Sequence, residues 1–151
     1  MDHPQFVPEL ARLHFEEWGY LNPQETLDER AQRLTGFVGR GGVPTALVAM
    51  TDEELVGSAL LVAHDMRTRT DLSPWLAGVY VKPAYRQRGV ASSLVARVEA
   101  EAIALSVPCL YLYTPSEAPF YARRGWQTLE QTEYRGVAVT VMRKTMVTPT
   151  V

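Results

Sequence analysis

Residues 76–91 read LAGVYVKPAYRQRGVA, an apolar run followed by a basic turn that contains one glycine. The apolar segment from Trp75 to Val81 predicts a short strand that stops at Lys82-Pro83, because proline cannot donate to a strand ladder. From Gly89 to about Leu105, apolar residues recur at helical spacing and predict a long helix that Pro108 ends. We therefore expect a strand, a tight turn and a helix.

The turn from Arg86 to Ala91 has the composition of an anion-binding loop. A helix that starts directly after a turn leaves unpaired N–H groups at the positive end of its dipole. Gly89 lets the backbone approach a ligand closely, and Arg86 and Arg88 add positive charge. Alone, this short pattern is weak, because a helix with an arginine-rich start is more often a solvated helix end. No G-x-x-x-x-G-K-[ST] loop occurs, and Gly36–Gly42 lacks the preceding strand of a dinucleotide-binding loop.

The segments on either side of this unit complete one expected domain, residues 1–151. Before it, the pattern predicts two helices and an antiparallel hairpin, at residues 5–18, 26–38, 46–50 and 56–63. The second helix starts with a capping box at Thr26 and ends in Gly39–Gly42. After the unit, it predicts a strand, a short helix and a hairpin, at residues 109–113, 119–124, 126–131 and 137–143. This order predicts a mixed α/β sheet.

The composition excludes several classes of protein. The 151 residues are 46% hydrophobic, which is enough for one compact core. A net charge of -2 provides no general attraction for nucleic acid. Because Cys109 is the single cysteine, we expect no intrachain disulfide, no cysteine-based zinc site and a reducing, cytoplasmic location. Met1–Pro4 is unlike the start of a signal peptide and no eighteen apolar residues run together, so we expect no membrane span.

Two segments resemble the signatures of the GNAT superfamily of N-acetyltransferases. Leu76–Ala91 closely resembles that family's strand, loop and helix, with [QR]-x-x-G-x-[GA] after V-x-P-x-x-R. About thirty residues later, PFYARRGW (residues 119–126) is similar to its second signature, an aromatic segment with a tyrosine followed by Gly-aromatic. The expected order of elements from residue 5 to 144 also matches. The resemblance implies a GNAT fold, with a mostly antiparallel sheet of about six strands that splays at a cofactor cleft and about four flanking helices.

The resemblance also implies acetyl-coenzyme A (acetyl-CoA) as acyl donor, no metal, and a set of binding residues. Backbone groups of the strand would pair with the pantetheine arm, at Val79, Tyr80 and Val81. The loop would hold the pyrophosphate, through Arg86, Gln87, Arg88, Gly89, Val90, Ala91 and Ser92. Thr114 stands where the family often has asparagine, seven residues before a tyrosine, so its contact with the pantetheine region is a departure from the pattern.

The implied reaction transfers an acetyl group to a primary amine of a small molecule or peptide, by direct attack through a tetrahedral intermediate. A fixed strand N–H near Val79 is the expected oxyanion donor, and Tyr121 matches the family's general acid, which protonates the thiolate. The base stays open between a water chain and six side chains: Glu16, Glu17, His64, Asp65, Asp71 and Glu117. Four aromatic residues are candidates either for the amine pocket or for the core: Trp18, Tyr20, Trp75 and Tyr134.

Other interpretations remain open on the sequence alone. A non-catalytic acyl-CoA-binding or regulatory domain would keep the loop without needing Tyr121, and an interaction module would bind no nucleotide. For an enzyme, the acceptor is a peptide N-terminus, a polyamine, an aminoglycoside or a small metabolite amine. The family's usual first strand is missing, because Met1 lies almost directly before the first helix. Either the sheet is short by one strand or the chain starts late, and an exposed edge is a possible homodimer contact.

Overall fold

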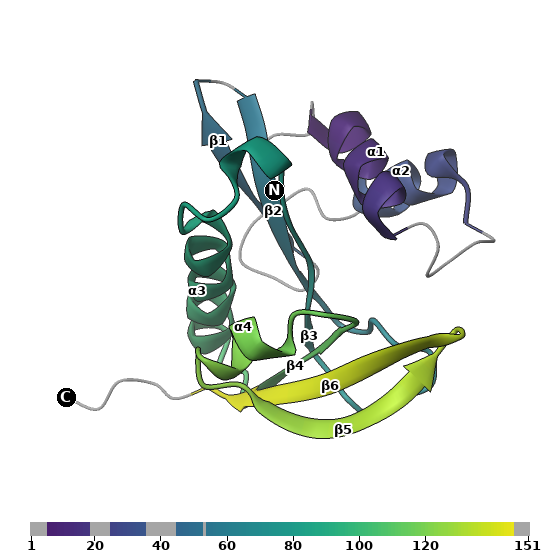
Figure 1. Cartoon of the computed structure of the whole chain (residues 1–151), viewed down its shortest axis with the longest axis vertical. Helices are drawn as coiled ribbons and strands as arrows, with labels where there is room; N and C mark the ends of the chain where they lie inside the picture. Colours follow the sequence, from purple (N-terminus) through teal and green to yellow (C-terminus); the bar gives the residue numbers. More distant parts are fainter. Residues whose placement is uncertain (1–5, 19–24, 36–44, 53, 147–151) are drawn as a thin grey trace.

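The computed structural model describes residues 6–18, 25–35, 45–52 and 54–146. In these ranges the chain forms one six-stranded sheet with helices packed on both faces (Figure 1). The elements follow in the predicted order: α1 (Val7–Trp18), α2 (Leu27–Thr35), β1 (Thr45–Thr51), β2 (Glu54–Val62), β3 (Trp75–Val81), η3 (Pro83–Tyr85), α3 (Val90–Ala104), β4 (Cys109–Thr114), α4 (Ala118–Ala122), β5 (Gln127–Tyr134) and β6 (Val137–Thr145).

The strand order is β1-β2-β3-β4-β6-β5. Every neighbouring pair is antiparallel except β3 and β4, which run parallel because α3 returns the chain to the same end of the sheet. The β3–β4 ladder contains a single register pair, Trp75 with Tyr111, and the two strands part beyond it. The expected mixed, mostly antiparallel sheet with a splay between these strands is therefore confirmed.

Each face of the sheet has its own apolar layer. On one face α1 and α2 pack on the strands, with Leu10 and Leu34 in the same cluster as Leu60. On the other face α3 and α4 cover the sheet, where Val98 and Leu112 belong to the second cluster. Because successive side chains of a strand point to opposite faces, the buried strand β2 contributes to both layers.

Local sequence signals account for two element boundaries. The capping box before α2 forms as predicted, since the Thr26 N–H donates to Glu29 Oε1 at 3.0 Å and the Glu29 N–H donates to Thr26 Oγ1 at 3.1 Å. Arg135 and Gly136 both have positive φ, 53° and 81°, which is the backbone of a two-residue hairpin turn. This tight turn lets β5 run to Tyr134, beyond the predicted end at Gln131, while β6 is longer than predicted at its other end, Thr145.

Two expectations concern parts of the chain at the limits of the described residues. The described part of α2 ends at Thr35, and the predicted continuation through Val38 to Gly39–Gly42 lies outside the described residues. Among the described residues β1 is one edge of the sheet, and residues 1–5, where an additional strand would precede α1, are also outside them. The pairing of that edge with a second subunit stays a prediction.

Candidate active site

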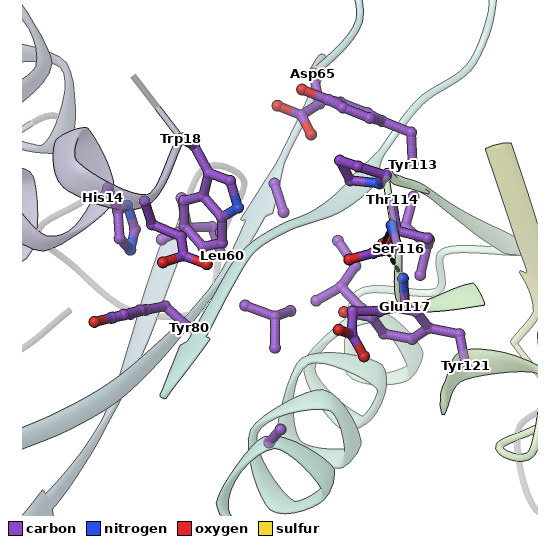
Figure 2. Close-up of a pocket in the computed structure, with 18 of the residues that line it drawn as sticks. His14, Trp18, Leu60, Asp65, Tyr80, Tyr113, Thr114, Ser116, Glu117 and Tyr121 are labelled. Atoms are coloured by element: carbon purple, nitrogen blue, oxygen red, sulfur yellow. Dashed lines mark hydrogen bonds between the residues drawn. The ribbon is translucent and has the colours of Figure 1, made fainter. Parts of the chain in front are cut away.

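A cleft of about 990 Å³ opens where β3 and β4 separate. Figure 2 shows its two sides: His14, Trp18 and Tyr80 lie across the space from Tyr113 and Tyr121. The cleft continues along β3 to the start of α3, so the predicted loop, strand and tyrosine line one cavity.

The loop before α3 presents unpaired backbone donors to this cleft. The first bond within α3 runs from the Ser93 N–H to the Gly89 carbonyl at 3.0 Å, and no side chain caps the helix. The N–H groups of Val90, Ala91 and Ser92 therefore precede the helical ladder, at the positive end of the helix dipole. Three such donors beside basic side chains fit the pyrophosphate of a coenzyme.

The backbone of the loop is unusual in a way that suits a ligand. Gly89 has φ +80°, and a Cβ atom placed on it would meet no atom within 4 Å. Glycine is thus favoured there by its left-handed backbone, while the space beside it is open to a ligand. Gln87 also has positive φ, 63°, without being glycine. Such strain in a non-glycine residue is concentrated at ligand sites.

The arginines of the region differ in where their side chains lie. Arg86 lines the cleft: its Nε donates to the Val81 carbonyl at 2.8 Å, and its guanidinium lies 5.7 Å from the centre of the Tyr80 ring. Arg88 instead lies over the Tyr85 ring and lines a separate, shallow depression beside β1. The Arg88 side chain therefore does not line the cleft.

Strand β3 is irregular where it borders the cleft. Its register with β2 slips between Ser58 and Leu60, where two residues of β3, Gly78 and Val79, lie opposite one residue of β2. Gly78 has φ +58°, and a Cβ atom there would lie 2.8 Å from Leu60 Cδ1. The result is a β-bulge at which glycine is favoured by its left-handed backbone and by the close approach of Leu60. It lies within the segment expected to bind the pantetheine arm.

Tyr121 of α4 is 7% exposed, and its ring reaches from α4 into the cleft (Figure 2). The rings of Phe120 and Trp126 hold it edge-on, at centroid distances of 5.0 and 6.1 Å. Burial, and then the negative charge of Glu117, raise the pKa of Tyr121 well above the usual value of a tyrosine. The hydroxyl thus keeps its proton at neutral pH and is available as a donor.

The Thr114 side chain stabilises the turn that leads into α4. Its Oγ1 accepts hydrogen bonds from the N–H groups of Glu117 at 2.9 Å and Ser116 at 3.3 Å. These bonds turn the chain from β4 into α4 and so fix the place of Tyr121. Thr114 also lines the cleft, and its hydroxyl hydrogen is the one group left for a ligand.

The structure separates the six candidates for the base. Four of them line the cleft: Glu17, His64, Asp65 and Glu117. The other two form ion pairs with neighbouring arginines and do not line it. Glu16 pairs with Arg12 at 3.1 Å, and Asp71 pairs with Arg69 at 3.1 Å.

The aromatic candidates fall into cleft residues and a core residue. Trp18 and Tyr134 line the cleft. Trp75 is fully buried and its Nε1 donates to the Leu72 carbonyl at 2.8 Å, so it is a core residue. Tyr20 lies outside the described residues.

The residues of the cleft that were not predicted from the sequence include His14, Tyr113 and Arg124. His14 occupies a buried position in the apolar stripe of α1, where a polar residue is a signal in itself. Tyr113 belongs to an alternating strand whose two faces the sequence alone does not distinguish. Arg124 lies within the second signature segment, and its role depends on a contact with α3 that no local pattern shows.

Two negative findings concern the described residues only. Nowhere in residues 6–18, 25–35, 45–52 and 54–146 do three or more His, Cys, Asp or Glu side chains gather as they would around a metal ion. In the same ranges, no helix has the length and apolar character needed to cross a membrane.

Comparison with known proteins identifies the same family over most of the chain. The family model for the acetyltransferase (GNAT) domain matches residues 5–129. An aminoglycoside N(6')-acetyltransferase type 1 from Salmonella typhimurium is 40% identical over 57 residues, which are 36% of this chain and 39% of that enzyme. The match thus spans about two fifths of that relative.

Solved structures show the same fold at lower identity. An aminoglycoside 6'-N-acetyltransferase complexed with coenzyme A has a TM-score of 0.75 at 17% identity, covering 98% of this chain and 94% of that one. A ribosomal-protein-alanine N-acetyltransferase from Brucella melitensis has a TM-score of 0.71 at 20% identity, covering 94% and 95%. With its signature loop, splayed sheet and family match together, the chain belongs to the GNAT acetyltransferase family, whose members are acyl-CoA-dependent acyltransferases with acetyl-CoA as donor.

Proposed function

We propose that this chain transfers the acetyl group of acetyl-CoA to a primary amine, by direct attack through a tetrahedral intermediate. One observation carries the proposal: a single cleft joins an uncapped helix start, a bulged strand edge, a protonated tyrosine and acidic side chains. A simple anion-binding site needs only the first of these features, whereas the other three would provide oxyanion stabilisation, a proton donor and attraction for an amine.

The loop and the strand provide the donor half of the site. The N–H groups of Val90, Ala91 and Ser92 would hold the pyrophosphate, with Arg86 as the nearest loop cation. The edge of β3 that faces the gap would pair with the pantetheine arm as an added strand. When bound, acetyl-CoA supplies the activated acetyl thioester.

The chain's own groups would then stabilise charge and move a proton. The Val79 N–H is a backbone donor fixed by the bulge, so it can bind the developing oxyanion without reorganising. Tyr121 keeps its proton because its pKa is raised, and its hydroxyl would donate that proton to the leaving thiolate.

Acidic and aromatic side chains of the cleft support a cationic acceptor. Glu17, Asp65 and Glu117 line the cleft beside the aromatic rings of Trp18 and Tyr113, and three further arginines line it as well: Arg30, Arg67 and Arg135. Carboxylates attract an alkylammonium group, and aromatic faces add cation–π attraction. Together with the match to an aminoglycoside acetyltransferase, this supports a polyamino acceptor as the first to test.

A thiol-release assay tests the proposal. Acetyl-CoA is incubated with a panel of an aminoglycoside, a polyamine, an alanine-terminated peptide and a small metabolite amine, while calorimetry measures coenzyme A binding. We expect coenzyme A to bind and at least one amine to release thiol. Binding without release from any amine would favour a non-catalytic acyl-CoA-binding domain, and absence of both would refute any role with this coenzyme.

A further inference from the structure

Two buried polar residues, Ser58 and His14, form a hydrogen-bonded chain to the bulge of β3 from the side of β2. The Ser58 hydroxyl of β2 donates to the Gly78 carbonyl at 2.8 Å. His14 Nε2 of α1 lies 2.8 Å from the same Ser58 oxygen. His14 is 2% exposed and Ser58 0%, so both bonds are shielded from water. The three groups form a chain that runs from α1 through β2 to the edge of β3 that faces β2.

The direction of each bond in this chain follows from its chemistry. A carbonyl oxygen can only accept, so the single hydrogen of the Ser58 hydroxyl is used on Gly78. Toward the imidazole, Ser58 can then only accept a hydrogen bond. His14 must therefore carry a hydrogen on Nε2 and donate it to Ser58.

The held carbonyl decides where the next N–H points. In a trans peptide, the Gly78 carbonyl and the Val79 N–H lie in one plane and point in opposite directions. Because the carbonyl is bound to Ser58 on β2, the Val79 N–H is directed toward the other side of β3. That side faces β4, and the single β3–β4 register pair lies at Trp75, so this edge borders the open cleft.

We propose that His14 and Ser58 are positioning residues for acetyl transfer, because they hold the Gly78 carbonyl and thereby aim the Val79 N–H at the oxyanion. This rests on the proposed function, since the oxyanion forms only if an amine attacks the thioester in this cleft. Neither residue needs to touch the reacting atoms. They act by fixing the orientation of the peptide group that joins Gly78 to Val79.

The same chain connects the acceptor side of the cleft to the bulge. Trp18 follows His14 by one helical turn, and their rings are 5.0 Å apart. Trp18 and Tyr80 are also in edge contact, at 5.9 Å, and both line the cleft. A movement of α1 on binding an amine would therefore displace His14 and, through its hydrogen bond with Ser58, shift the bulge.

Two pairs of variants test the proposal. Ser58→Ala removes the bond to Gly78, and Val98→Ala, in the core of α3 away from the cleft, is a matched control for lost stability. His14→Leu removes the donor to Ser58, whereas His14→Gln loses the ring but keeps an N–H near the position of Nε2. The amide signal of Val79 is recorded by nuclear magnetic resonance in the coenzyme-free protein, together with its hydrogen-exchange rate. Long-range ¹H–¹⁵N spectra report the His14 tautomer, and kcat and KM are measured with the best amine.

We expect the spectra to show hydrogen on His14 Nε2 and the Val79 signal to move in Ser58→Ala and His14→Leu. We expect kcat to fall about 10- to 100-fold in these two variants, because a misaligned oxyanion donor loses much of its effect, with KM for acetyl-CoA changed less than threefold or so. His14→Gln should recover at least half of that loss on a logarithmic scale, and Val98→Ala should leave the Val79 signal and kcat near the wild-type values.

Three results would overturn the proposal: an unchanged Val79 signal in Ser58→Ala, an equal fall of kcat in Val98→Ala, or no difference between His14→Leu and His14→Gln. A moved signal with an unchanged kcat would likewise show that the chain is only structural. If no amine of the panel causes the wild type to release thiol, the proposed function fails. The Val79 signal alone then decides whether His14 and Ser58 hold the bulge.

Discussion

The guanidinium of Arg124, in the turn after α4, donates to Ser92 Oγ in the first turn of α3 through both Nε, at 3.0 Å, and a terminal nitrogen. Its other terminal nitrogen donates to the Phe120 carbonyl at 2.9 Å, and the group lies 3.7 Å from the centre of the Phe120 ring. Because the Ser92 oxygen accepts these bonds, its own hydrogen is free to point at the loop. The contact therefore adds a second cation beside the loop and leaves the Ser92 hydroxyl able to donate a hydrogen bond to a ligand.

Arg124→Gln should weaken coenzyme A binding about tenfold, since it removes a charge and its charge-assisted bonds at the anion site. Arg123→Gln is the matched control, because Arg123 is an exposed neighbour that does not line the cleft. Calorimetry with coenzyme A measures both. Equal affinities for the two variants would contradict a role of Arg124 in binding.

Gly89→Ala and Gly136→Ala form a second matched pair. Both glycines have φ near +80°, and a Cβ atom on either would meet nothing within 4 Å. Each alanine should therefore cost a similar free energy of unfolding, roughly 1–2 kcal/mol, for its left-handed backbone. Coenzyme A affinity should fall, by about tenfold, in Gly89→Ala alone, because only that methyl group occupies the space before α3. Chemical denaturation and calorimetry check the two effects separately, and equal losses of affinity would disprove the assignment of the loop.

Tyr121→Phe should lower kcat by roughly 10²- to 10⁴-fold if the hydroxyl is the general acid. Coenzyme A affinity and the melting temperature should change little, because the phenyl ring keeps the contacts with Phe120 and Trp126. Tyr111→Phe, in β4 and outside the cleft lining, is the control and should keep kcat near the wild-type value. Wild-type turnover in Tyr121→Phe would transfer the acid role to another group or to water.

Alkaline pH should destabilise the protein through two buried tyrosines. Burial is the main cause that raises the pKa of both Tyr113 and Tyr121, followed by the charges of Asp65 and Glu117 respectively. Above about pH 10 the unfolded chain loses these protons while the folded chain keeps them. The free energy of unfolding should therefore be fully retained below about pH 10 and fall above it, by up to about 1.4 kcal/mol per pH unit for each tyrosine.

Urea denaturation between about pH 9 and about pH 11 measures this slope. Tyr113→Phe and Tyr121→Phe should each make it shallower, because phenylalanine has no proton to lose. The comparison with wild type removes the contributions of lysines and arginines, which all three proteins share. An identical slope in all three would show that neither hydroxyl is kept protonated by folding.

Much of the fold was predictable because its signals are local. The strand that stops at Pro83, the turn through Gly89 and the helix after it are encoded by adjacent residues, and they form as predicted. The capping box at Thr26 is equally local. The order of elements then restricts the topology, because a strand-helix-strand crossover makes β3 and β4 parallel neighbours. For the same reason the loop from Arg86 to Ala91 is predictable from the sequence.

The composition of the site could not be read in the same way. Glu16 and Glu17 are adjacent in sequence, yet one pairs with Arg12 and the other lines the cleft, because neighbouring residues of a helix point in different directions. Trp75 and Trp18 looked equivalent as candidates, and the sheet buries the first completely.

The sequence by itself determined the donor: a backbone anion site at a helix start depends on a few consecutive residues, and the resemblance of that stretch to one family names the coenzyme. Only the tertiary structure decided what surrounds it. Ser92 and Arg124 are 32 residues apart, and His14 and Ser58 are 44 apart. Such contacts form because packing brings different elements together, and no local pattern of side chains specifies which polar groups will then be within 3 Å or so of each other.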